Sequence, residues 1–321
     1  MRWLLGVLAR LWLALSLTFA LSECGGADPV RQMMGPQASA AEVQRVRRGL
    51  GGDAPWPVRY VRQLQAFVGP VPKGSAASEP GALKFGGLHF SLGTSYVRHT
   101  PVARAIAERI GATSALALAI LLFECVFGLT LGLLLRGRRS QGIADAGGAI
   151  AASVPAFVLA MVLQAVFAAA LGWFPIGGFE GSPMLRLRAL ILPALSVGVL
   201  GATMYAKVAH DLWSDIERQP YPRTARAKGL SKRRTFFMHT ARNSLVPLVV
   251  MLATDAGLLF GGVVTVENVF RFPGLGTLAV QSVMAGDLPM LTGIVVVATV
   301  AVSVCSGLGR VASRWLGAPL T

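Results

Sequence analysis

The stretch YPRTARAKGLSKRRTFFMHTARNSLVP, residues 221–247, separates two long apolar segments of this 321-residue chain. Pro220 and Pro222 prevent the preceding apolar helix from continuing into it, because proline lacks a backbone donor and clashes with the previous turn. Residues Arg223–Lys228 then predict a short helix with a slim surface of threonine and alanine. Gly229 suits the left-handed conformation that ends a helix. The stretch therefore predicts a short helix that stops at a glycine, beside a membrane surface.

A second helix is predicted directly after this glycine. Ser231 suits its N-cap, and Lys232–Leu245 then carries an apolar patch of Phe236, Phe237 and Met238. The basic residues at its start oppose the helix dipole, which an acidic lipid or an acidic partner surface would compensate. A plain loop on the positive side of a membrane explains the charge but not the order of alanine, glycine and serine. We therefore interpret the stretch as a docking surface.

The composition indicates a membrane protein. Hydrophobic residues make up 54% of the chain and charged residues 14%, whereas soluble domains carry about 25% charged residues. A spanning helix needs about 20 predominantly apolar residues. The fold class predicted is an all-α polytopic membrane protein with six transmembrane helices. The six apolar segments are Trp3–Ser22, Ala112–Leu135, Ala144–Leu171, Leu190–Ala209, Leu248–Val269 and Pro289–Leu308.

The net charge of +15 is explained by basic residues that flank the predicted spans. In a soluble protein this charge would suggest a nucleic-acid partner, but here the basic residues flank the apolar segments. Short loops rich in lysine and arginine lie in the cytoplasm, which predicts cytoplasmic termini. The residues that decide this are Arg136, Arg138, Arg139, Arg218, Arg223, Arg226, Lys228, Lys232, Arg233, Arg234, Arg242, Arg310 and Arg314.

The predicted domains follow from these spans. Residues 1–22 form the first transmembrane helix, and 23–110 form a long external region, since long loops cross the membrane regardless of their charge. Residues 111–309 form a five-helix core that contains the cytoplasmic loop 210–246. Residues 310–321 form a cytoplasmic tail.

The external region carries few regular elements. Ala40–Gly49 predicts a short surface helix, and Asp53–Tyr60 begins another with proline in its first turn. Gly69–Gly87 is rich in Gly, Pro, Ser and Ala and predicts a loop. Val102–Ile110 predicts a helix at the membrane surface that leads into the second span.

Small residues at four-residue spacing predict close approach of the spans. Such faces let helix backbones pack closely in lipid. They comprise Gly128 and Gly132, Gly198 and Ala202, and Ala253, Gly257 and Gly261.

The sequence lacks the motifs of an enzyme. It contains no G-x-x-x-x-G-K-[ST] phosphate loop, and its four histidines are scattered without the spacing of a metal site. We expect no catalytic residue, no metal site and no cofactor in this chain. An energy-driven step would have to be powered by a partner.

Among the polar residues of the predicted spans, Glu124, Gln164 and Asp255 lie well inside the apolar segments. Charges inside a membrane are costly and usually functional, so these residues are candidates for a polar translocation pathway that attracts a cationic group of the cargo. The alternative is a structural role, in which Glu124 and Asp255 form a buried polar pair or carry a proton.

The chain resembles the B-type permease subunits of the dipeptide, oligopeptide and nickel ABC importers. The resemblance covers nearly the whole length and rests on two specific blocks. These are Arg223-Thr-Ala-Arg-Ala-Lys-Gly-Leu230 with His239, Arg242, Asn243 and Pro247, and Glu267-x-x-Phe270-x-x-Pro273-Gly-Leu-Gly276 with Asp287 and Pro289. Weaker matches include Leu92-Gly-x-Ser95 and Trp173-x-Pro175.

This resemblance implies a type I importer fold in the bacterial inner membrane. It implies a heterodimer with a C-type permease, two cytoplasmic ATPase subunits that bind ATP and Mg²⁺, and an external peptide-binding protein. The ATPase-coupling loop would comprise Arg223, Thr224, Ala225, Arg226, Ala227, Lys228, Gly229, Leu230 and Ser231. An external hairpin that faces the binding protein would contain Glu267, Pro273, Gly274 and Gly276.

The implied function is ATP-driven import of peptides by alternating access. A nickel complex and glutathione are alternative cargoes, and a proton-coupled secondary transporter that uses Glu124 and Asp255 is a rival mechanism. The chain departs from the family pattern at Glu124, where an apolar or small residue is usual.

Overall fold

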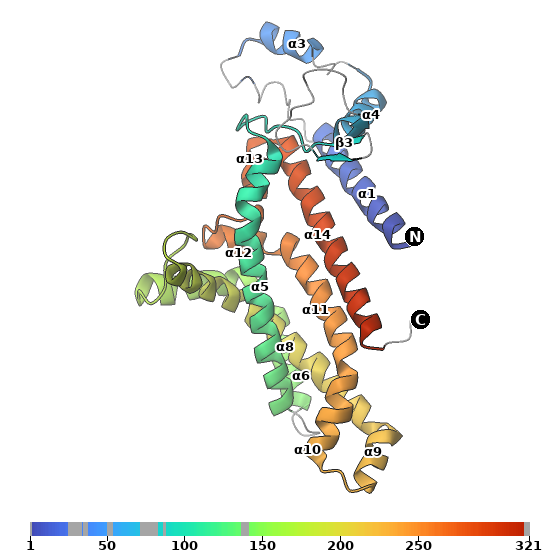
Figure 1. Cartoon of the computed structure of the whole chain (residues 1–321). Coiled ribbons are helices and arrows are strands. Elements are labelled where there is room, and N and C mark those ends of the chain that lie inside the picture. The colour runs from blue at the N-terminus through green and yellow to red at the C-terminus, as the bar shows by residue number, and fades with distance from the viewer. Residues whose placement is uncertain are drawn as a thin grey trace. The chain divides into compact units, whose positions relative to one another are not determined.

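The computed structural model is nearly all helical, as the sequence predicts (Figure 1). Arg136, Arg138 and Arg139, and most of the Gly69–Gly87 segment, lie outside the described residues. The residues that the structure describes are 2–24, 34, 38–49, 54–70, 83–85, 88–135 and 141–317.

Five helices in this part of the chain are long and apolar enough to cross a membrane. Each one contains most or all of a span that the sequence predicts, and polar residues extend most of them beyond its apolar part. Hydropathy identifies only the apolar section of a helix, which explains the difference in length. The five are α1 (Arg2–Cys24), α5 (Val102–Leu134), α8 (Pro183–Arg218), the run Lys232–Gly261 and α14 (Leu288–Trp315).

The predicted span Ala144–Leu171 is not one continuous helix. It is divided into α6 (Gln141–Ser153), α7 (Ala156–Leu163) and a π-helical segment, η2 (Gln164–Ala170). Pro155 causes the break, because its extended backbone (φ −62°, ψ 133°) stands outside both helices and proline disfavours a helical residue before it. Both α6 and α7 pack against α8.

Two other boundaries differ from the sequence prediction. The predicted surface helix Val102–Ile110 continues into α5 without a break. The predicted span Leu248–Val269 is divided between α11 (Arg242–Gly262) and α12 (Val264–Val269), which meet at Val263.

A small antiparallel sheet interrupts the otherwise helical N-terminal part. Its strands β1 (Val68–Pro70), β2 (Leu83–Phe85) and β3 (Leu88–Phe90) are arranged in the order β1-β3-β2. The prediction of a loop over Gly69–Gly87 is therefore wrong near its two ends, where β1 and β2 lie. Strands of three residues are too short to show the alternation of apolar and polar residues that predicts a strand.

The two predicted helices of this region are confirmed as α3 (Ala40–Gly49) and α4 (Trp56–Phe67). A capping box begins α3, in which the Ser39 N–H donates to Glu42 Oε2 over 3.0 Å and the Glu42 N–H donates to Ser39 Oγ over 3.3 Å. The Glu42 carboxylate also accepts a hydrogen bond from the Ser39 hydroxyl over 2.7 Å, and this bond, together with the one from the Ser39 N–H, lowers the pKa of the Glu42 carboxyl.

The chain divides into two compact units, residues 1–111 with 274–301, and residues 112–273 with 302–321. In the first unit, the buried Asp287 joins two motifs that are distant in sequence. Its carboxylate accepts hydrogen bonds from the Ser95 hydroxyl, from the Tyr96 N–H (3.2 Å) and from the Met290 N–H (3.4 Å). Asp287 therefore caps α14 and fixes the turn after β3.

The second unit has an apolar core and tightly packed helices. A side chain at Gly128 would place its Cβ 2.5 Å from Tyr205 Cβ and 2.7 Å from the Ala202 carbonyl oxygen. Gly257 approaches Val302 in the same way, at 2.9 Å from its Cα. The predicted small-residue faces therefore contain true backbone contacts. The core comprises Ala112, Leu116, Ile120, Ala160, Leu163, Ala168, Leu192, Ala194, Val263, Val266, Phe270 and Phe272.

The Gly128 contact gives a direct test of this packing. The substitution Gly128→Ala should lower the apparent unfolding temperature of the detergent-purified protein, because overpacking a tight contact costs about 1–3 kcal/mol. Gly111→Ala is the matched control on the same helix, since its added Cβ would meet no described atom within 4 Å. Equal unfolding temperatures for the two variants would contradict the contact.

Candidate functional site

The candidate coupling loop begins where α8 ends at Arg218. Gln219 is extended (φ −64°, ψ 156°) and serves both as the C-cap of α8 and as the N-cap of α9 (Pro220–Ala227). Pro220 occupies the first position of α9, where a missing N–H costs nothing. The prediction that proline separates the loop helix from the preceding span is confirmed.

Gly229 ends α9 in a Schellman motif. Its φ is +91°, a conformation that only glycine adopts without strain. The Gly229 N–H donates to the Arg226 carbonyl over 3.0 Å, and the Leu230 N–H donates to the Ala225 carbonyl over 3.2 Å. This pair of hydrogen bonds satisfies the last carbonyls of α9 and turns the chain sharply.

Ser231 caps the next helix, as the sequence predicts. Its side chain accepts a hydrogen bond from the Arg234 N–H over 3.3 Å. The helix that follows is α10 (Lys232–Thr235), which passes into a π-helical segment, η3 (Phe236–Ala241), and then into α11.

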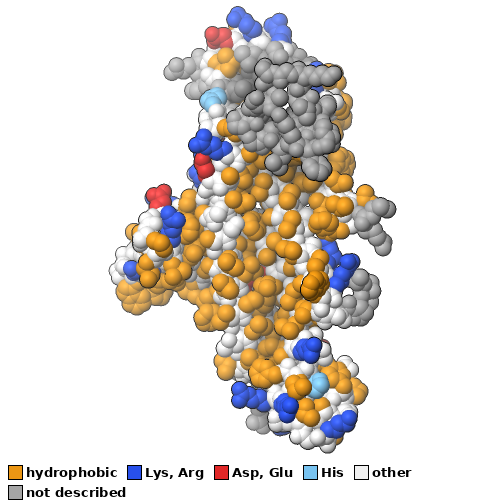
Figure 2. Space-filling model, in the orientation of Figure 1, with side chains coloured by type: hydrophobic (Ala, Val, Ile, Leu, Met, Phe, Trp, Pro, Cys, Tyr) orange, Lys and Arg blue, Asp and Glu red, His pale blue; other side chains and the backbone are white. Residues whose placement is uncertain are grey.

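Most of the coupling loop is exposed. Figures 1 and 2 show it at one end of the second unit, where α9 and α10 lie and where Lys and Arg side chains reach the surface. Ala225 and Leu230 are half-buried within the turn. The exposed members are Arg223, Thr224, Arg226, Ala227, Lys228, Gly229 and Ser231.

Tyr221 anchors α9 to the start of α11. Its hydroxyl accepts a hydrogen bond from Asn243 Nδ2 over 2.8 Å. Its ring meets the His239 ring edge to face, with centroids 6.1 Å apart. The spacing of His239 and Asn243, four residues apart on a helical run, is thus explained by their shared partner.

The base of the loop is held by Trp213 of α8. Its indole N–H donates to Ser244 Oγ over 2.8 Å, and its ring packs edge to face against Phe236 at 5.3 Å. Phe236 is consequently buried, while Phe237 and Met238 are exposed. Of the apolar patch predicted for these three residues, Phe237 and Met238 lie at the surface, whereas Phe236 packs inward against Trp213.

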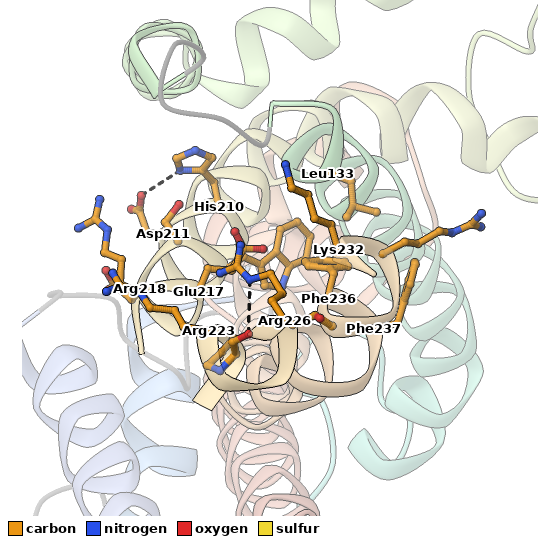
Figure 3. Close-up of a pocket in the computed structure, with 16 residues that line it drawn as sticks. Leu133, His210, Asp211, Glu217, Arg218, Arg223, Arg226, Lys232, Phe236 and Phe237 are labelled. Atoms are coloured by element: carbon orange, nitrogen blue, oxygen red, sulfur yellow. Dashed lines mark hydrogen bonds and ion pairs between the residues drawn. The ribbon is translucent and has the colours of Figure 1, made fainter. Parts of the chain in front are cut away.

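A polar pocket of about 1250 Å³ lies between the end of α8 and helices α9 and α10 (Figure 3). His210 is 4% exposed, and its Nδ1 lies 3.4 Å from Asp211 Oδ1. The sequence analysis missed the acidic residues that line this pocket, Asp211, Asp215 and Glu217. They recur at short intervals in the polar end of α8, and this pattern could have indicated them. The charged lining is Asp211, Asp215, Glu217, Arg218, Arg223, Arg226, Lys232 and Arg233.

The structure brings two of the three candidate pathway residues together. Glu124 of α5 interacts electrostatically with Asp255 of α11, and Asp255 accepts a hydrogen bond from the Tyr205 hydroxyl over 2.7 Å. The sequence analysis missed Tyr205. Gln164 lies elsewhere, where its amide donates to the carbonyls of Ile176 (2.7 Å) and Val269 (3.0 Å). Gln164 thus ties the loop after η2 to α12.

The predicted hairpin contains a buried carboxyl group. Glu267 is fully buried and accepts a hydrogen bond from Thr113 Oγ1 over 2.7 Å. The chain bends at Arg271, which has a φ of +48°.

A helix, α13 (Leu275–Ala285), begins after Pro273, with Gly274 as its N-cap. Gly276, which the sequence analysis places in the hairpin, therefore lies in the first turn of α13. The left-handed glycine is instead Gly286 (φ +65°), which ends α13.

The matching families fit this architecture. Residues 125–319 match the family described as binding-protein-dependent transport system inner membrane component, and residues 1–117 match its N-terminal companion. The chain belongs to this family.

Named relatives of this inner-membrane component are transport permeases. This chain is 32% identical over 291 residues to the glutathione transport system permease protein GsiC of Salmonella paratyphi A. The match covers 90% of this chain and 87% of the relative. The chain is 34% identical over 284 residues to a putative peptide transport system permease protein of Brucella abortus, covering 86% and 84% of the two chains.

Two solved structures share the permease fold. The inward-facing MetNI methionine ABC transporter matches with a TM-score of 0.54 and 19% identity, over 67% of this chain and 97% of that chain. An amino acid ABC transporter matches with a TM-score of 0.51 and 15% identity, over 66% and 94%.

Family membership fixes the general role of the chain. It is a multi-pass inner-membrane component of an ABC importer, and it works with ATPase subunits and a substrate-binding protein. It is a transport subunit, and its partner ATPases hydrolyse ATP.

The anchor at Tyr221 can be tested by hydrogen exchange. Tyr221→Phe removes the acceptor for Asn243 and should speed amide exchange of residues 224–228 several-fold, since such a hydrogen bond contributes about 0.5–1.5 kcal/mol. Tyr60→Phe is the matched control, because it removes a hydroxyl that meets Ser16 in the other unit. Unchanged exchange in the Tyr221 variant would show that this contact does not hold α9.

Proposed function

We propose that this chain is the permease subunit through which an ATP-driven importer passes peptides across the inner membrane. The relatives named for peptide and glutathione transport support this class of cargo. In this proposal the chain forms a heterodimer with a C-type permease, and both termini lie in the cytoplasm. An external region then faces the peptide-binding protein, and the segment from Glu267 to Gly276 forms a gate on that side.

The coupling loop, residues 223–231, receives the movement of an ATPase subunit in this mechanism. The observation that carries the proposal is an exposed short helix whose two ends are fixed. Gln219 and Pro220 set its start, the Schellman motif at Gly229 sets its end, and Tyr221 anchors its side. A helix held in this way transmits a push as a rigid body, whereas a flexible loop would absorb it.

The transport cycle follows from two conformations of the permease pair. ATP binding closes the ATPase dimer and draws the coupling loops together, which opens the permeases toward the binding protein. Each ligand shifts this equilibrium only by the difference between its affinities for the two states. ATP and the loaded binding protein must therefore both prefer the outward-open state.

The test is uptake of a labelled dipeptide by proteoliposomes that contain the complete importer, with ATP on the ATPase side. The Gly229→Val variant should lower uptake roughly tenfold, because a β-branched residue at positive φ costs about 1–3 kcal/mol. ATP hydrolysis should continue, so that more ATP is consumed per dipeptide.

Gly229→Asn is the matched control, since asparagine tolerates the left-handed region better than valine. Normal coupling in Gly229→Val would overturn the docking role of the loop. Uptake that continues without nucleotide and follows a proton gradient would overturn the ATP-driven mechanism. Absence of dipeptide uptake by the unmodified importer would overturn the peptide cargo.

A further inference from the structure

Three polar side chains from three helices meet inside the second unit. They are Glu124 of α5, Tyr205 of α8 and Asp255 of α11. Glu124 is 5% exposed and Tyr205 is 2% exposed, while Asp255 is half-buried. The Tyr205 hydroxyl donates to Asp255 Oδ2, and the two carboxyl groups are close enough to interact electrostatically. We name these three residues the carboxyl cluster.

The packing of α5 against α8 makes room for the Glu124 carboxyl. A Cβ at Gly201 would lie 1.9 Å from Glu124 Oε1, so no other residue at position 201 leaves space for the carboxyl as it stands. One turn further along α5, Gly128 lets the backbone approach Tyr205. The position of Glu124 is therefore defined by the fold of the helices around it.

The cluster has more acceptors than donors. Within the described part of the chain, the Glu124 side chain has no hydrogen bond or ion pair, and the Tyr205 hydroxyl gives Asp255 its one side-chain hydrogen bond. Lys207, two residues after Tyr205, is already paired with Asp145 and is exposed. A buried carboxylate without a partner costs several kcal/mol. A positive charge supplied from outside this chain would offset that cost at Glu124, which is buried near a second carboxyl group.

We propose that the carboxyl cluster binds the cationic nitrogen groups of basic peptides as they pass through the importer. This inference rests on the proposed function and names the cargo more closely. Carboxylates only accept hydrogen bonds, whereas an ammonium or guanidinium group only donates them. A basic peptide carries a net positive charge that complements two carboxyl groups. A peptide with neutral side chains carries no net charge, and its own carboxylate is repelled by the cluster.

Tyr205 has a positioning role in this site. Its hydroxyl fixes one oxygen of Asp255 and leaves the other oxygen, together with both oxygens of Glu124, to accept from the cargo. The phenol itself cannot neutralise the cluster, because at neutral pH it carries no charge.

The experiment compares two peptides in proteoliposomes that contain the complete importer and ATP. One is a lysine-containing tripeptide, and the other is the same tripeptide with acetyl-lysine, which removes the side-chain charge but keeps the termini. The measured quantity is the ratio of their uptake rates at saturating binding protein. This ratio, compared between permease variants, cancels the preference of the binding protein.

Glu124→Gln and Asp255→Asn should each lower this ratio about tenfold, the effect of one hydrogen bond to a charged group. Tyr205→Phe, which keeps both carboxyls, should lower the ratio less. Glu108→Gln is the matched control: it removes an exposed carboxylate on the same helix, and it should leave the ratio unchanged.

Ratios unchanged in all three cluster variants would overturn this inference. Loss of the partner permease from purified Glu124→Gln and Asp255→Asn complexes would also overturn it, since the cation would then belong to the partner permease. If those two variants do not fold, an unchanged ratio in Tyr205→Phe overturns it and a lowered ratio supports it. Failure of the unmodified importer to take up either peptide contradicts the proposed peptide function instead.

Discussion

The left-handed backbone of Gly229 is the constraint on which the coupling loop depends. It lets α9 end with its last carbonyls satisfied and lets Ser231 start α10 two residues later. Without that turn the chain would not bring Tyr221 back to Asn243 and His239. One conformation that suits glycine thus organises a surface to which two helices contribute. The sequence contains no G-x-x-x-x-G-K-[ST] phosphate loop, and in the proposed mechanism the movement that powers transport enters through this surface.

The body of the second unit depends on a different balance. Helices in lipid gain little from the hydrophobic effect, so close packing and polar contacts hold them together. Gly128 and Gly257 supply the close packing. The buried carboxyl groups are of two kinds. Glu267 accepts a hydrogen bond from Thr113, whereas the Glu124 side chain has no hydrogen-bond donor in the part of the chain that the structure describes. The hydrogen bond from Thr113 stabilises the buried Glu267, whereas in our proposal the cargo supplies the donor for Glu124.

Much of this architecture could be predicted from the sequence, for identifiable reasons. Long apolar segments are recognisable from hydropathy alone. Pro220, Gly229 and Ser231 have local conformational preferences that agree with the fold. The break at Pro155 was present in the sequence but was outweighed by the apolar run around it. The three-residue strands left no pattern. Tyr205 was missed because its role depends on Asp255, 50 residues away. The motif residues Ser95 and Asp287 looked independent until the fold placed them in contact.

Site-specific photo-cross-linking in the assembled importer tests directly whether α9 docks on an ATPase subunit. A photoreactive amino acid replaces Ala227, which is exposed at the end of α9, or Met184, which is 68% exposed at the start of α8. We expect a cross-link from position 227 to an ATPase subunit and none from position 184. A cross-link from position 227 to lipid or to the binding protein alone, with no ATPase captured, would contradict it.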